Sequence, residues 1–158
     1  MINRPQDAQS SGTIMPISLS PQWLKEYELN IECIDLQHRY FFTLIFKIAR
    51  ELRTTQAPHL REELVAELNA YARFHFISEE NFMSEHGFPE LTSHKFQHLA
   101  LLDQLSAKQN ALVLHANEQE EQAFVHFLFD WFVNHTTKTD RIFADYYHAK
   151  KSNLPTGN

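Results

Sequence analysis

The chain has 158 residues, a formal net charge of −6 and 43% hydrophobic residues. This length suits one domain with a single core, and the mildly acidic balance argues against nucleic acid and anionic membranes as partners. No segment approaches the roughly 18 consecutive apolar residues of a membrane span, and no signal peptide is expected. The single cysteine rules out an internal disulfide and suits a reducing compartment, so we expect a cytoplasmic protein.

The two ends of the chain lack helical periodicity. Residues 1–20 are rich in Ser, Gln, Pro and Asn and predict a flexible N-terminal tail. Trp23 and Tyr27 follow this tail and are expected to anchor a short arm on the body of the protein. Residues 150–158 predict a C-terminal linker that could lead to an output domain in a longer protein. The folded domain is therefore expected over residues 21–149.

Between these ends, apolar residues recur three and four positions apart, which is the spacing of one helix face. The four stretches with this pattern cover residues 34–52, 64–82, 91–112 and 124–142. Breaks are expected at Pro58, at Gly87-Phe88-Pro89 and around Asn117. The chain has only three glycines and few alternating β-branched runs, which argues against a sheet. We predict an all-α fold: an antiparallel up-down-up-down four-helix bundle with an N-terminal arm.

Seven side chains that can bind metal lie on these apolar stripes. They are His38, His75, Glu79, His94, His98, His135 and Asp140. They alternate between early and late positions on successive helices, so antiparallel packing would bring them to one depth in the interior. A buried carboxylate without a partner is costly, and no Lys or Arg lies on the stripes beside the two acids. A pair of metal ions is the simplest source of the missing positive charge.

The spacing of any one pair is weaker evidence than the set. Other histidines that precede an acid by four residues are better interpreted as pairs on solvent-exposed helix faces or turns. These are His59, His86 and His126. His94 and His98 form the only His-x-x-x-His pair in the chain, a spacing that places two imidazoles on one helix face about a turn apart.

The step of five from His135 to Asp140 leaves the common face of a regular helix. Either a π-type turn widens the helix there, or Asp140 reaches the site from a neighbouring edge. Two six-coordinate ions would use five imidazoles, two bridging carboxylates and a bridging oxo or hydroxo group, and would keep one position open for a small ligand. These donors suit iron, although zinc or manganese could occupy the same site.

Several stretches of the chain together resemble the hemerythrin family, of the bacterial kind, over residues 23–147. They are Ile34-Asp35-Leu36-Gln37-His38, His75-Phe76-Ile77-Ser78-Glu79-Glu80-Asn81-Phe82-Met83, Phe88-Pro89 with His94 and His98, and Trp131 with His135 and Asp140. The resemblance implies two Fe ions in a non-haem di-iron centre, with a bridging oxo or hydroxo group, that binds O2 reversibly.

The resemblance also implies a role for each candidate ligand. One iron would be held by His94, His98 and His135. The other would be held by His38 and His75 and would have the open position. Glu79 and Asp140 would bridge the two ions.

Two positions in the implied O2 pocket depart from the family pattern, which has Trp-Leu and His-Ile around the histidine of the fourth helix. Here the residues are Trp131-Phe132 and His135-Thr136. Phe132 is bulkier than leucine and would narrow access to the pocket. Thr136 either hydrogen-bonds to its own helix backbone or makes the pocket wetter. A wetter pocket would speed the loss of bound O2 as peroxide, which suits a sensor better than a store.

We therefore expect an oxygen- or redox-sensing module rather than an enzyme. Members of the family are found fused to signalling outputs, so the module could belong to a longer protein such as a diguanylate cyclase or a chemotaxis receptor. A stand-alone O2 carrier or store is the main alternative. A di-iron oxidase or ferroxidase fits less well, because those enzymes use Glu-x-x-His motifs and mostly carboxylates, whereas the chain has no Glu-x-x-His. A metal-free structural bundle is the remaining alternative.

Overall fold

The structure is a computed structural model that describes residues 22–54, 58–114 and 117–153. The expected tail at residues 1–20 and most of the expected C-terminal linker, residues 154–158, lie outside the described residues. Over the described ranges the chain is helical and contains no strand, which confirms the all-α prediction.

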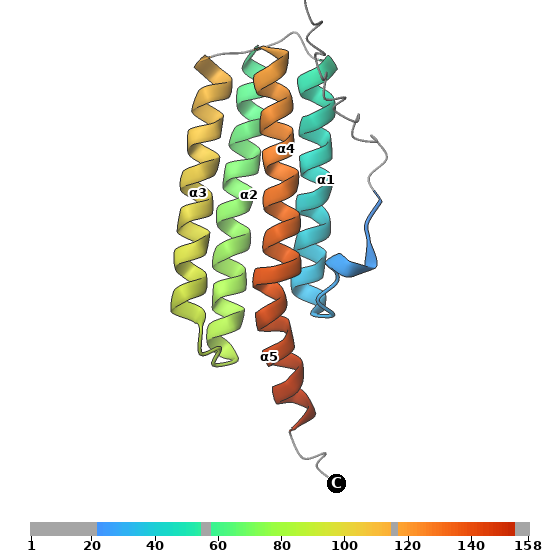
Figure 1. The fold of residues 1–158 in the computed structure, drawn as a ribbon, viewed down its shortest axis with the longest axis vertical. Coiled ribbons are helices and arrows are strands. Elements are labelled where there is room, and N and C mark those ends of the chain that lie inside the picture. The colour runs from blue at the N-terminus through green and yellow to red at the C-terminus, as the bar shows by residue number, and fades with distance from the viewer. Residues whose placement is uncertain (1–21, 55–57, 115–116, 154–158) are drawn as a thin grey trace, which may run out of the picture.

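Four long helices form the body of the protein. They are α1 (Glu32–Thr54), α2 (Pro58–Glu85), α3 (Leu91–Leu114) and α4 (Glu118–Asn134). They stand side by side and alternate in direction (Figure 1). Each helix packs against the next, and α4 also packs against α1 to close the ring. The predicted up-down-up-down bundle is therefore confirmed.

The breaks between helices occur where the sequence predicts them. Gly87 has φ +68°, a left-handed conformation that glycine adopts without strain. It follows the end of α2, and the N–H of Phe88 then donates to Met83 O (3.0 Å), so that the chain reverses toward α3. Asn117 caps α4, because its side-chain oxygen accepts a hydrogen bond from Glu120 N (3.0 Å).

The fourth helix continues through an irregular turn. A π-helical segment, η2 (His135–Asp140), joins α4 to α5 (Arg141–Ser152), and α5 extends beyond the other helices (Figure 1). A π-type turn is one of the two explanations that the sequence predicts for the five-residue step from His135 to Asp140. α5 ends at Ser152, so residues 150–152, the first part of the predicted C-terminal linker, are helical. The apolar residues of α5 and those that form hydrogen bonds hold α5 to the bundle. The helical segment therefore continues beyond residue 142, where the apolar periodicity in the sequence ends.

The N-terminal arm packs against α1 and the fourth helix. It contains a short 3-10 helix, η1 (Lys25–Tyr27), and the side chain of Tyr27 is buried. The Trp23 ring contacts the Phe42 ring edge-on, with centroids 5.6 Å apart. These contacts confirm the two aromatic anchors that the sequence predicts. The arm is also held by α5, since Arg141 Nη2 donates to Glu28 O (2.7 Å).

Two apolar clusters fill the bundle. The larger includes Phe41, Leu68, Leu105, Phe124 and Leu128. The smaller consists of Leu29, Ile31, Ile34, Met83, Phe88, Phe143 and Ala144. His38 on α1, Glu79 on α2 and both ligands of η2 lie in sequence between a residue of the larger cluster and a residue of the smaller one, so the candidate ligands form a polar layer across the core. No helix in the described part of the chain is both long and apolar enough to span a bilayer.

Candidate metal centre

All seven residues that the sequence selects are brought together in the interior. α1 contributes His38; α2 contributes His75 and Glu79; α3 contributes His94 and His98; η2 contributes His135 and Asp140. None of these residues is more than 7% exposed, and Asp140 is completely buried. The convergence follows from the antiparallel order, which places early positions on one helix beside late positions on the next.

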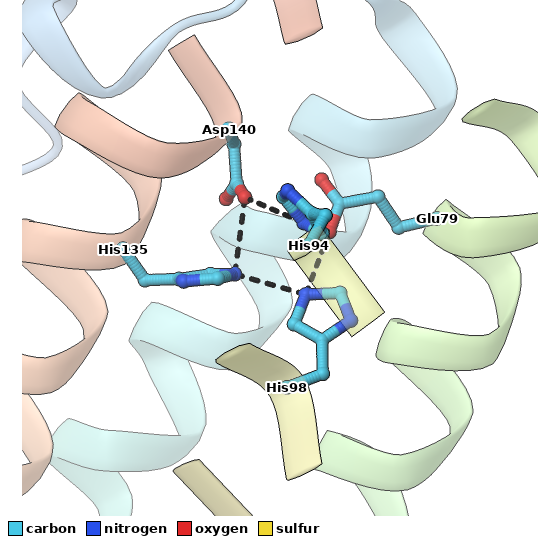
Figure 2. A group of neighbouring side chains, drawn as sticks. All are labelled: Glu79, His94, His98, His135 and Asp140. Carbon is cyan, nitrogen blue, oxygen red and sulfur yellow. Dashed lines mark hydrogen bonds and ion pairs between the residues drawn. The ribbon is translucent and has the colours of Figure 1, made fainter. Parts of the chain in front are cut away.

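The π-helical turn explains how His135 and Asp140 reach the same site. Five steps of a regular helix rotate a side chain by about 140° from its starting direction. A turn with i→i+5 hydrogen bonds is wider and reduces this offset to about 50°. Both residues can therefore face the interior, as Figure 2 shows.

The donor atoms fall into two groups. One contains Glu79, His94, His98, His135 and Asp140, with ligand atoms all within 4.8 Å of one another. The other contains His38, His75 and Glu79, again within 4.8 Å. Glu79 belongs to both groups. Asp140 also connects them, since its Oδ1 lies 3.0 Å from His135 Nε2 and its Oδ2 lies 3.4 Å from His38 Nε2.

Glu79 makes similar approaches to the histidines of α3. Its Oε2 lies 3.4 Å from His94 Nε2 and 3.3 Å from His98 Nε2. For six-coordinate ions with bonds of about 2.1 Å, adjacent ligand atoms are about 3.0 Å apart. The spacing between these donors is therefore close to the spacing around a shared metal ion.

Several buried donor atoms lack a hydrogen bond, although other polar atoms lie near. Among the described residues these include both ring nitrogens of His38, Glu79 Oε1 and both carboxylate oxygens of Asp140. Buried polar atoms are seldom left without partners, and the short approaches of Asp140 to histidines lack hydrogen-bond geometry. Lone pairs that converge on a common point explain both facts. The donor set thus fits a pair of cations.

Two imidazoles face each other across the first group. His98 Nε2 lies 2.9 Å from His135 Nε2, as the dashed line in Figure 2 shows. His98 Nδ1 lies 2.8 Å from Glu80 Oε1. A carboxylate can only accept, so Nδ1 carries the proton of a neutral His98 and its Nε2 has a free lone pair. That lone pair is directed into the site, as a metal ligand requires.

The electrostatics of the site keep both acids ionised. Burial raises the pKa of the Asp140 carboxyl, but His135 and His38 lower it more, to well below its usual value. Burial and the charge of Asp140 raise the pKa of Glu79. The hydrogen bonds from His94 and His98 have a larger effect in the opposite direction, so the pKa of Glu79 falls to about 2. Two negative charges are therefore present in a closed interior, where cations are favoured.

The imidazoles differ in how they balance this charge. Burial, together with the nearby His38, lowers the pKa of His75 to about 3, so this ring is neutral and able to donate a lone pair. Burial also opposes the charged form of His135, but Asp140 outweighs it and raises the pKa of His135. Asp140 therefore favours the charged form of this ring.

A small cavity lies beside the second group of donors. It is lined by His38, Phe41, His75, Phe76, Trp131, Phe132, His135 and Thr136. Its volume is about 10 Å³. That is about the minimum for one water molecule. All three residues predicted to line an O2 pocket border this cavity.

Among the described residues, the Thr136 hydroxyl does not form a hydrogen bond to its own helix backbone, which is one of the two alternatives that the sequence leaves open. The neighbouring Thr137 Oγ1 donates to Val133 O (2.7 Å), but no hydrogen bond of the Thr136 hydroxyl is found within the described ranges. Thr136 is only 1% exposed. Its position on the cavity wall favours the alternative in which it makes the pocket more polar.

Two residues that contact the candidate ligands from outside are not selected by the sequence reasoning. Glu80 accepts from His98, and Gln37 Oε1 lies 3.0 Å from His75 Nδ1. Both are adjacent in sequence to selected residues and lie within the stretches that resemble the family, but the residue pattern does not mark them as partners of the histidines. By contrast, the histidines expected to lie outside the site, His59, His86 and His126, belong to neither donor group.

The fold and the site define a class of protein: four-helix bundles that hold a histidine- and carboxylate-rich metal site in their core. The chain matches the family model of the hemerythrin HHE cation binding domain over residues 29–147. It is 33% identical to a bacteriohemerythrin of Methylococcus capsulatus over 123 residues, which cover 75% of this chain and 89% of that protein. A bacteriohemerythrin of Clostridium acetobutylicum is 26% identical over 127 residues, covering 78% of this chain and 98% of that protein.

Solved structures agree with this match. The crystal structure of a leucine-to-alanine mutant of hemerythrin has a TM-score of 0.69 and 26% identity, and the match covers 78% of this chain and 94% of that one. The chain belongs to the hemerythrin family, and the resemblance noted in the sequence is confirmed. It is a metal-binding, O2-binding domain of that family, and the histidine and carboxylate cluster is its candidate metal centre.

Proposed function

We propose that the domain holds two iron ions and binds O2 reversibly at one of them. The observation that carries this proposal is the division of seven buried donors into two groups that share Glu79, with a small cavity lined by both histidines of the second group and by His135 of the first. Two ions would use both groups, and a small ligand would have space at the His38 and His75 end. When bound, the iron pair would supply the electrons for reversible O2 binding.

The proposed ligand assignment follows the two groups. His94, His98 and His135 would hold one iron. His38 and His75 would hold the other, which has the open position. Glu79 and Asp140 would bridge the ions together with an oxo or hydroxo group. The excess of imidazole over carboxylate favours iron with a binding role over a high-valent oxidation catalyst.

The chain's own residues would also control the environment of the ligand. Trp131 and Phe132 would exclude water from the cavity, and Phe132 would limit the size of a ligand that can enter. The Thr136 hydroxyl would offer a polar contact in an otherwise apolar wall. We also propose a cytoplasmic location, because a chain with a single cysteine suits a reducing compartment.

The test is iron analysis combined with absorption spectra of the anaerobically reduced protein before and after exposure to air. We expect two irons per chain, and a visible charge-transfer band that forms in air and disappears when O2 is removed. His135→Gln should lower the iron content, whereas the control His59→Gln should not, because His59 is exposed and belongs to neither donor group. Absence of a bound transition metal would overturn the proposal.

A sensory role is supported by one specific connection. Asp140 is followed directly by Arg141, whose Nη2 donates to Glu26 O (3.0 Å) and Glu28 O (2.7 Å) of the arm. A change at the metal centre that moved Asp140 would reach α5 and the arm through this contact. Such a module would act on an output domain of a signalling protein. If oxidation leaves hydrogen exchange in α4, α5 and the arm unchanged, this role is excluded.

A stand-alone O2 carrier or store is the alternative. It is supported by the match to the bacteriohemerythrin of C. acetobutylicum. The match covers 98% of that protein, so that relative consists almost entirely of this domain. A long-lived oxygenated form would favour the carrier, and rapid conversion to the diferric state would favour the sensor. Sustained O2 consumption with added ferrous iron would instead support an oxidase.

A further inference from the structure

The candidate ligands are oriented by contacts on the side away from the metal centre. When Nε2 of a histidine binds a metal, Nδ1 carries a proton and needs an acceptor. Two of the five histidines have a side-chain acceptor for this proton within the described residues. His98 faces Glu80, and His75 faces Gln37. One acceptor is a carboxylate and the other is a neutral amide, and the two serve different donor groups.

Glu80 is well placed to act on His98. Its Oε1 is 2.8 Å from His98 Nδ1, and its side chain is only 18% exposed. Its other oxygen lies 3.6 Å from Nζ of Lys95, a side chain that is about half exposed. The ring of His98 is also fixed by Phe76, which stacks on it with centroids 3.8 Å apart and planes 10° from parallel. The geometry leaves His98 one orientation, with Nε2 toward the site.

Gln37 holds His75 in a comparable way but without charge. Its Oε1 is 3.0 Å from His75 Nδ1, while its Nε2 donates to Ser78 Oγ (2.9 Å). The Tyr71 hydroxyl also donates to Gln37 O (2.9 Å). If Nε2 of His75 binds the metal, its Nδ1 carries the proton, and only the oxygen of the Gln37 amide can accept it. Gln37 then presents an oxygen acceptor to His75, and the Ser78 hydroxyl accepts from the other end of the amide.

We propose that Glu80 and Gln37 are positioning residues that make the two metal positions unequal. This inference rests on the proposed di-iron function. Glu80 places a negative charge behind the iron held by His94, His98 and His135, and favours its ferric state. Gln37 leaves the iron held by His38 and His75 without such a charge, so that iron returns to the ferrous state more readily.

The physical reason is the strength of the hydrogen bond from Nδ1–H. A carboxylate acceptor forms a charge-assisted bond, which pulls the Nδ1–H proton toward the carboxylate. More electron density then stays on the imidazole ring, and its Nε2 becomes a stronger donor to the metal. A stronger donor favours the more highly charged ion. An amide acceptor orients the ring equally well but polarises it less. The position that needs to release O2 therefore has the weaker partner.

The first test uses Zn²⁺, which has no redox chemistry. Metal-free protein is titrated with Zn²⁺ in competition with a chromophoric chelator. Glu80→Gln keeps an acceptor for His98 but removes the negative charge. We therefore expect the affinity for one of the two bound ions to fall by about tenfold. This is the lower end of the loss seen when a hydrogen-bond partner behind a metal ligand is removed. The control is Glu67→Gln, which removes an equal charge from the exposed part of α2 where Glu67 pairs with Lys47 (2.8 Å).

The second test measures the two one-electron midpoint potentials of the iron-loaded protein. Glu80→Gln should raise one of them; a tenfold loss of preference for Fe³⁺ corresponds to about 59 mV. Gln37→Glu should lower the other, and the double variant should exchange the order of the two. Lys95→Gln should lower the potential that Glu80→Gln raises, because it removes the cation that offsets Glu80. A purely structural role would not produce these opposite signs.

The outcomes separate the inference from the function on which it rests. If the wild-type protein does not bind two metal ions, the proposed function fails. If it binds two but Glu80→Gln behaves like Glu67→Gln in both tests, the function stands and the inference is wrong. Should Glu80→Gln fail to fold, Lys95→Gln and Gln37→Glu still decide the matter, because each predicts a lowered potential and an unchanged potential contradicts it.

Discussion

At the scale of single residues, Thr136 is the position whose chemistry sets the character of the cavity. It is buried on the cavity wall, and no partner for its hydroxyl is found in the part of the chain that the structure describes. A hydroxyl in this place can hold a water molecule or contact a bound ligand. Either effect would make it easier for bound O2 to leave in a protonated, reduced form.

Replacement of Thr136 by valine tests this directly, because valine has nearly the same shape without the hydroxyl. We expect the oxygenated protein to decay to the oxidised form several-fold more slowly in Thr136→Val than in the wild type. The free energy of unfolding of the metal-free protein should rise by about 1 kcal/mol or less, since a buried hydroxyl without a bond is removed. Absorption decay and denaturant titration measure the two effects. Faster decay in the variant would contradict the assignment.

Tyr71 gives a second prediction at this scale, because it connects α2 to the residue that orients His75. Burial, with a smaller effect of Tyr40, raises the pKa of Tyr71 to about 12, against about 10 in an unfolded chain. Because the pKa of Tyr71 is higher in the folded than in the unfolded chain, its protonated phenol contributes to the stability of the fold. This contribution is complete below about pH 10 and is lost as the pH rises toward 12. The difference in unfolding free energy between wild type and Tyr71→Phe should therefore shrink over this range. A difference that stays constant would show that the phenol is not protected.

At the scale of elements, the fourth helix combines two tasks in one continuous segment. Its π-helical turn places His135 and Asp140 on the same side, and α5 then holds the N-terminal arm. The sequence predicts a widened turn only as one of two alternatives, because the five-residue step is equally compatible with an approach from a neighbouring edge. The partners of Arg141 and His148 are backbone oxygens of the arm, and residue spacing carries no information about such contacts.

The contact between α5 and the arm can be tested through Arg141. Arg141→Met removes the two hydrogen bonds to Glu26 O and Glu28 O and keeps much of the side-chain length. We expect a loss of about 2 kcal/mol of stability and faster hydrogen exchange of amides in residues 23–29, with iron content unchanged. Lys138→Met is the control, because Lys138 Nζ bonds only to Asn134 Oδ1 on the exposed surface (2.7 Å). Equal effects of both variants would show that Arg141 has no special part in holding the arm.

At the scale of the whole molecule, the core consists of two apolar clusters separated by a polar layer. The helices and the depth of this layer could be predicted, because the stripes of residues such as Phe41 and Leu68 continue through His38 and His75. The acceptors Glu80 and Gln37 could not, since both lie off the apolar stripe and their role depends on how neighbouring helices are rotated. The size of the cavity also depends on side-chain packing, which the residue pattern does not determine.

Removal of the metal should weaken the molecule as a whole, because the polar layer joins all four helices. An ion that binds only the folded state adds about 2.7 kcal/mol of stability at a free concentration a hundredfold above its Kd. We expect chelation of both ions to lower the melting temperature clearly while helical circular dichroism is retained, since imidazoles can partly balance the acids. Differential scanning calorimetry with and without chelator checks this. An unchanged melting temperature would favour the metal-free structural bundle.

The two tryptophans of the chain give the molecule optical labels of its own. Trp131 borders the small cavity and also an open groove of about 550 Å³ between α3 and α4, whereas Trp23 belongs to the arm. Iron close to an indole quenches its fluorescence, so emission from a Trp23→Phe variant would follow the filling of the centre alone. Emission from Trp131→Phe would follow movement of the arm, and the two signals recorded together would time one event against the other.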